Sequence, residues 1–172
     1  MSKNCFIFGV LLIVASLLVV GCNSATAANL EPGEVTFDLS VIEIKGATEG
    51  IPAPEVDPTT LSLGYRFTGP GDFDADNPNK WQVSTYMFSP ASMTVAQGDK
   101  VTLRSFIING DEHTVWIEAP DGSKVVNNEL MNRGREYEVT FSADQAGYYT
   151  LHCNEHSPTM SAKILVIPNQ VG

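Results

Sequence analysis

Hydrophobic and polar residues alternate strictly from residue 35 to residue 41, where every second side chain is apolar. This period of two predicts a half-buried β-strand. Ile42 and Ile44 then fall on the opposite parity, which indicates a bulge or a shift between sheets. We expect the strand to end at Gly46.

A second strand is predicted by the alternation of Leu61, Leu63, Tyr65 and Phe67. Before it, residues 50–58 contain three prolines, so this segment is expected to be an extended connector and not an inner strand.

Residues 68–80 are rich in Gly, Pro, Asp and Asn, which predicts a loop. Asp72, Asp74 and Asp76 have the opening spacing of a calcium loop. The glycine and the closing glutamate that such a loop needs are both replaced. An acidic surface loop is therefore the better interpretation.

The rest of the chain is a dense series of short apolar alternations, several of them separated by glycine-containing turns. Strands are expected at residues 81–88, 92–96, 100–109, 113–118, 137–142, 147–153 and 163–167. Residues 127–135 are expected to hold a turn of helix at most. The chain is therefore predicted to be all-β, an antiparallel sandwich or barrel.

The first 21 residues combine Lys3 with an unbroken apolar run and predict a signal peptide. The ending Val19-Val20-Gly21-Cys22 resembles the lipobox of bacterial lipoproteins, which implies lipidation of Cys22. A competing cleavage site at residues 25–27 would release a soluble protein. With either ending the protein is expected to be exported, to the periplasm or the cell surface.

The 172 residues provide for one domain and an extension. Residues 22–34 are small and polar and are expected to form the anchor and a flexible tether. Residues 35–80 are expected to form an N-terminal β extension with the acidic loop, and residues 81–168 the main domain.

The formal net charge of −10 makes nucleic acid an unsuitable partner. The acids are concentrated in residues 31–76, where ten of them face only Lys45 and Arg66. Such a surface would steer basic proteins, although solubility alone also accounts for it.

Cys153 is the only cysteine after residue 22. Exported proteins normally pair their cysteines, so a solitary one indicates a reactive thiol or a metal ligand. Tyr149 and Leu151 share its parity, which aims all three side chains at one interior face. His156 and Met160 follow closely, and His113 lies forty residues upstream after a tight turn. Two imidazoles, a thiolate and a weak axial thioether are the ligand set of a blue-copper site.

Three separate motifs in residues 81–167 resemble the cupredoxins of the plastocyanin type. They are residues 92–101, the turn at residues 109–115, and residues 146–166 with their Gly, alternating aromatics, Cys-x2-His and Met. The resemblance implies a cupredoxin-type Greek-key β-sandwich with extra N-terminal strands, and one copper ion as cofactor. It implies His113, Cys153 and His156 as equatorial ligands and Met160 as the axial ligand.

Two further roles follow from the same resemblance. Asn154 matches a position whose side chain ties the two ligand loops together. His152 falls where the family often carries an aromatic residue used for remote electron entry, although a surface position is an equally good interpretation.

The sequence departs from the family in the interval before Met160, which is Cys-x2-His-x3-Met. The N-terminal part resembles, in a general way, the additional strands of nitrosocyanin-like proteins, whose red copper centre uses a glutamate. Glu112, next to His113, is the candidate for that position.

The hypothesis that follows is a blue copper protein that carries single electrons and is not an enzyme. Its expected partners are redox proteins such as cytochromes or membrane oxidoreductases, and the membrane through the lipid anchor. Two alternatives stay open, a red-copper site that binds or converts a small molecule, and a copper-delivery protein.

Overall fold

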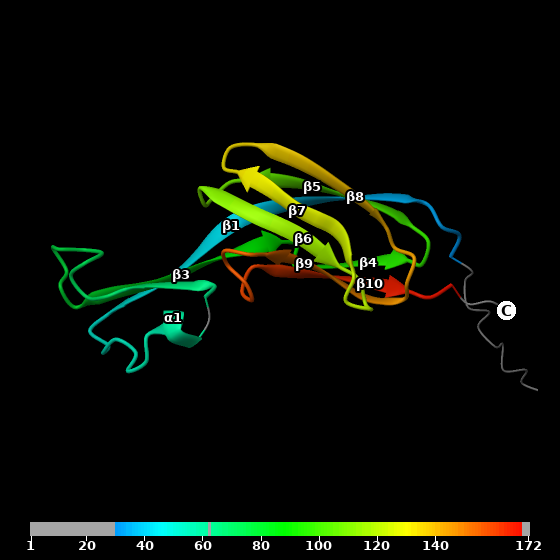
Figure 1. The fold of residues 1–172 in the computed structure, drawn as a ribbon. Helices are drawn as coiled ribbons and strands as arrows, with labels where there is room; N and C mark the ends of the chain where they lie inside the picture. Colours follow the sequence, from blue (N-terminus) through cyan, green and yellow to red (C-terminus); the bar gives the residue numbers. More distant parts are fainter. Residues whose placement is uncertain (1–29, 62, 170–172) are drawn as a thin grey trace, which may run out of the picture.

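The computed structural model describes residues 30–61 and 63–169, which form two β-sheets packed face to face (Figure 1). One sheet has the strand order β2-β3-β1-β5-β8 and the other β4-β10-β9-β6-β7. The elements are β1 (Glu34–Glu49), α1 (Pro58–Leu61), β2 (Tyr65–Thr68), β3 (Lys80–Ser89), β4 (Ser92–Ala96), β5 (Lys100–Ile107), β6 (Glu112–Glu118), β7 (Lys124–Asn132), β8 (Glu136–Ser142), β9 (Gly147–Cys153) and β10 (Ser161–Ile167). The prediction of an all-β sandwich is confirmed, but the strands are not all antiparallel as predicted, because β1 pairs with β5 and β10 with β4 in parallel.

Strand β1 lies in the middle of its sheet and uses two partners in succession. Residues 34–41 pair with β5 in parallel, and residues 40–49 pair with β3 in antiparallel. Leu39 and Val41 are fully buried between the sheets, whereas Ile44 is 45% exposed. The N-terminal part of the chain therefore supplies the sandwich core as well as an extension.

The change of parity at Ile42 coincides with the end of β5, whose Ile107 pairs with Val41. Beyond this point β1 continues with β3 alone. The predicted bulge or shift between sheets is wrong, because the register of β1 is uninterrupted and both of its partners belong to one sheet. The prediction that Gly46 ends the strand is wrong, because Gly46 keeps its place opposite Val83 and the ladder runs on to Glu49.

The strand predicted at residues 61–67 is shorter than expected. Residues 58–61 form the short helix α1 instead, which begins at Pro58, a residue well suited to the first helical position. Leu61 and Leu63 are exposed and only Tyr65–Thr68 pairs with β3. The two alternating leucines therefore do not form the buried face of a strand.

The turn of helix expected at residues 127–135 is also wrong, because residues 124–132 form the edge strand β7. Its register against β6 shifts between Val115 and Ile117, and its two buried residues, Val126 and Met131, are five positions apart. This irregularity breaks the period of two by which a strand is detected in a sequence.

The predicted signal peptide, the lipidation site Cys22 and most of the tether lie outside the described residues. No helix in residues 30–61 or 63–169 has the length and apolar character needed to cross a membrane.

Candidate metal centre

Strands β6 and β9 are neighbours and bring His113 and Cys153, which are 40 positions apart in the chain, to one end of the sandwich. Val115 pairs with Cys153, and His113 lies two residues before Val115 on the same face of β6. The side chains of His113 and Cys153 are both fully buried. The alternation of each strand therefore aims them into the space between the sheets.

The ligand atoms of His113, Cys153 and His156 form one compact group, all within 4.8 Å of one another. Cys153 Sγ lies 3.6 Å from Nδ1 of His113 and 3.6 Å from Nδ1 of His156. Metal bonds of about 2.3 Å to sulfur and about 2.0 Å to nitrogen bridge such separations when one ion lies between the atoms at wide angles. The three residues therefore fit a single first-row metal ion.

The orientation of the His113 ring is fixed by a hydrogen bond at Nε2, the nitrogen that faces away from Cys153. Its Nε2 lies 2.9 Å from the carbonyl oxygen of Asn109, to which a protonated Nε2 donates. This assignment leaves Nδ1 free as the metal-binding nitrogen. Gly110 has a φ of +81°, and a Cβ there would lie 2.3 Å from Nε2 of His113. The turn before β6 is therefore shaped around the imidazole.

Met160 is also fully buried. Its N–H donates to the carbonyl of His156 over 2.8 Å, and its own carbonyl accepts from the N–H of Cys153 over 3.2 Å. The loop between the cysteine and the methionine is thus closed on itself, and the backbone of Met160 lies beside that of Cys153 although the two residues are seven positions apart.

Glu155, which was not among the predicted site residues, approaches the thiol more closely than either imidazole nitrogen does. The thiol of Cys153 donates to its carboxylate over 3.1 Å, and the N–H of Thr114 donates to the same oxygen over 2.7 Å. Burial raises the pKa of Cys153 to about 12, and the hydrogen bond to Glu155 adds to this effect. A metal ion is therefore needed to hold this sulfur as a thiolate at neutral pH.

Glu155 itself is ionised. Burial alone would raise its pKa, but hydrogen bonds from Thr114 and from Cys153 outweigh that effect and bring the pKa to about 2. For His156, burial is the main cause that lowers the pKa, and the neighbouring His113 lowers it further. A lowered imidazole pKa favours the neutral form that binds metal.

Glu112 does not belong to the compact group of ligand atoms found among the described residues. It is exposed, on the opposite side of the β6 alternation from His113. The carboxylate expected near the site is therefore supplied by Glu155 and not by Glu112. No spacing rule would have found Glu155, because its direction depends on how the turn after Cys153 folds.

Asn154 ties the ligand loop to β6, partly as expected. Its N–H donates to the carbonyl of Thr114 over 2.9 Å, and its side-chain oxygen accepts from the indole of Trp116 over 2.9 Å. The side chain therefore reaches strand β6 beyond His113 and not the turn before it.

His152 stacks on Trp116, with ring centroids 4.2 Å apart and an angle of 16° between the rings. Nζ of Lys124 lies 4.1 Å from the centre of the Trp116 ring. Burial lowers the pKa of His152. The residue next to Cys153 is thus half-buried in an aromatic stack and is not a free surface side chain.

The sequence profile of the copper-binding proteins of the plastocyanin/azurin family matches residues 78–167. The chain belongs to this family. The fold is the cupredoxin β-sandwich, and the cofactor that the two histidines, the cysteine and the methionine suit is one copper ion.

The cupredoxin also has similarities to solved structures. Auracyanin A, a blue copper protein from Chloroflexus aurantiacus, is 17% identical with a TM-score of 0.46, over 78% of this chain and all of that one. The copper nitrite reductase of Nitrosomonas europaea is 15% identical with a TM-score of 0.48, over 81% of this chain and 43% of that one.

A multicopper oxidase, mgLAC, is 18% identical with a TM-score of 0.46, over 80% of this chain and 40% of that one. The cupredoxin thus spans less than half the length of these two enzymes. No curated protein matches the sequence.

Proposed function

We propose that this cupredoxin is a one-electron carrier. The observation that supports the proposal is the enclosure of the ligands, because His113, Cys153 and Met160 are all fully buried. Only His156 among the four is partly exposed. A site closed in this way favours the passage of electrons over the binding of a substrate at the metal.

A bound copper ion would supply the single-electron chemistry by cycling between Cu(II) and Cu(I), and the chain would keep the ligands in place. The ring of Tyr86 packs against both imidazoles, 5.2 Å from the centre of His113 and 4.4 Å from that of His156. Together with the Asn109 carbonyl behind His113, this packing restrains the ligands against rearrangement.

We propose two routes for the electron between the copper site and the surface. The first route passes through the partly exposed His156. The other leads from Cys153 through the adjacent His152 to Trp116, whose ring is stacked on it on the neighbouring strand. As part of the same proposal, we assign remote electron entry to the stack of His152 and Trp116.

The proposed setting is outside the cytoplasm, with the chain attached to the membrane by a lipid at Cys22. Redox proteins such as cytochromes or membrane oxidoreductases are the proposed partners. The acidic character of residues 31–76 favours partners with a basic docking surface.

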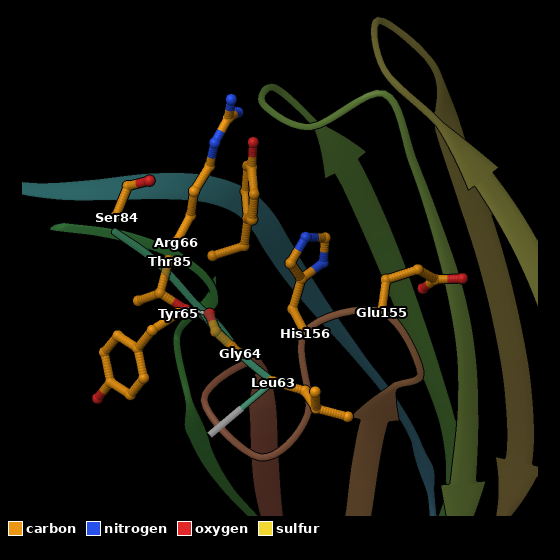
Figure 2. Close-up of a pocket in the computed structure, with 9 residues that line it drawn as sticks. Leu63, Gly64, Tyr65, Arg66, Ser84, Thr85, Glu155 and His156 are labelled. Atoms are coloured by element: carbon orange, nitrogen blue, oxygen red, sulfur yellow. Dashed lines mark hydrogen bonds between the residues drawn. The ribbon is translucent and has the colours of Figure 1, made fainter. Parts of the chain in front are cut away.

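A small-molecule site is the second candidate function. A pocket of about 210 Å³ borders His156 and Glu155 on the side of the extension, where Leu63, Arg66 and Tyr86 also line it (Figure 2). This pocket touches one ligand residue and gives such a molecule a place beside the copper site. Copper delivery is the third candidate, since Cys, His and Met also suit transfer of Cu(I).

Addition of Cu(II) to the metal-free protein separates the three functions. An intense blue or green thiolate absorption with narrow copper hyperfine splitting, and reversible one-electron voltammetry, are expected for the carrier. A red, tetragonal spectrum that changes when a small anion is added would replace the proposal by the small-molecule site. A colourless Cu(I) complex that exchanges readily with a chelator would replace it by delivery.

A further inference from the structure

The N-terminal extension touches the ligand loop at Gly64, just before β2. Figure 2 shows the chain at Leu63 and Gly64 passing close to the loop that carries Glu155 and His156. Gly64 is buried although its neighbours on both sides are exposed. A Cβ on Gly64 would lie 1.9 Å from Oγ1 of Thr159 and 2.7 Å from the carbonyl oxygen of His156. The backbone at Gly64 therefore packs directly against the ligand loop, and a side chain at position 64 would not fit.

Hydrogen bonds hold the contact together. Oγ1 of Thr159 lies 3.0 Å from the carbonyl oxygen of Gly64 and 2.6 Å from Oγ1 of Thr85 in β3. Thr85 also donates a short hydrogen bond to the Gly64 carbonyl. We call Gly64, Thr85 and Thr159 the latch. It joins three segments that are up to 95 positions apart in the sequence.

Thr159 lies between His156 and Met160, two of the copper-ligand residues. Its hydroxyl is 2.9 Å from the carbonyl of His156, the same carbonyl that accepts from the N–H of Met160. A shift of Thr159 therefore moves the His156 carbonyl and the Met160 amide together. Because the axial ligand and the imidazole tune a copper thiolate site, such a shift reaches the metal.

We propose that Gly64 and Thr85 are positioning residues of the copper site. By binding Thr159 they fix the loop that holds His156 and Met160, so the N-terminal extension is a structural part of the metal centre. The inference depends on the metal-binding role of the loop and is independent of whether the protein carries electrons.

The first test removes the hydroxyl of the latch with Thr159→Val and compares it with Thr159→Ser, which keeps a hydroxyl. A matched control is Thr102→Val, because Thr102 and Thr140 form a similar hydroxyl pair, 3.1 Å apart, on β5 and β8. Amide hydrogen exchange is measured in the metal-free protein. Exchange at Met160 is expected to be about fivefold faster in Thr159→Val, as for one hydrogen bond lost, and unchanged in Thr159→Ser and in the control.

The second test uses the copper-loaded protein. Gly64→Ala is compared with Gly46→Ala, since a Cβ at Gly46 meets nothing within 4 Å and neither glycine has a positive φ. Gly64→Ala is expected to change the ratio of the charge-transfer bands, the copper hyperfine splitting and the reduction potential. Gly46→Ala is expected to leave all three unchanged.

The proposal is overturned if Met160 exchange in Thr159→Val equals that of the Thr102→Val control. It is also overturned if Gly64→Ala keeps the spectrum and potential of Gly46→Ala. If Thr159→Val does not fold, Thr85→Val is used in its place. Thr85→Val is expected to speed amide exchange at Met160 in the metal-free protein and to change the spectrum and reduction potential of the copper-loaded protein. Because the exchange measurement uses no metal, its outcome does not depend on the proposed carrier function.

Discussion

Gly110→Ala tests how closely the turn before β6 is shaped around His113. The methyl group would lie 2.3 Å from Nε2 and 2.7 Å from Cε1 of the imidazole. Nε2 is also the atom that binds the Asn109 carbonyl. The substitution should therefore push the ring out of both its hydrogen bond and its place opposite the thiol.

The backbone alone contributes a cost that must be separated from this displacement. Gly110 has a φ of +81°, a conformation that costs a residue with a side chain about 1–2 kcal/mol. Gly122 provides the control, because its φ is +83° and a Cβ there meets nothing within 4 Å. Both alanine variants should lose a few degrees of thermal stability.

Only Gly110→Ala should also lose metal affinity, by about 10–100-fold, the usual effect of disturbing a residue that orients a ligand. Competition with a chelator for Cu(II) measures the affinity, and thermal unfolding of the metal-free protein measures the shared backbone cost. Equal copper affinities in Gly110→Ala and Gly122→Ala would refute the reasoning.

Further predictions concern the ligands, the loss of stability at low pH and the hydrophobic core. Cys153→Ser should abolish the thiolate absorption of the copper-loaded protein, whereas Met160→Gln should keep a colour and shift it together with the potential; colour without Cys153 would contradict the assignment. The pKa of Glu155 is lowered from 4.5 to about 2, so in the metal-free protein its stabilisation is complete above about pH 4.5 and is lost as the pH falls toward 2. Glu155→Gln should therefore lose about 1 kcal/mol of the change in unfolding free energy between pH 4.5 and pH 2, after allowance for solvent screening. The prediction is wrong if the unfolding free energies of the variant and the unchanged protein depend on pH in the same way. Leu39→Ala should cost about 2–5 kcal/mol in urea unfolding, while the exposed Leu61→Ala should change stability by less than about 0.5 kcal/mol; similar losses in both would mean that β1 does not fill the core.

Much of the fold could be predicted because the period of two survives wherever a strand has one buried face. Strands β4 and β9 have the residue limits that the alternation gave, and β5, β6, β8 and β10 differ by two residues or fewer at either end. Strand β7 was missed because a register shift separates its two buried residues. The strand predicted to begin at Leu61 was wrong because alternation predicts a strand only where another element covers the apolar face, and Leu61 and Leu63 are exposed.

The grouping of His113, Cys153 and His156 could also be predicted from the sequence. Ligand chemistry restricts the choice, since Cys153 is the only cysteine after residue 22 and the chain has three histidines. The parity of β6 and β9 then aims two of them at the same interior, and their pairing at Val115 and Cys153 brings them together.

The sequence by itself determined the ligand types, the strand that aims each one inward, and the copper chemistry that they suit. Only the tertiary structure decided which neighbours complete the site. Glu155 reaches the thiol because of the path of a turn, and Gly64 reaches Thr159 because β2 and the ligand loop meet although they are far apart in the chain. Such contacts depend on the packing of whole elements, and no local periodicity encodes them.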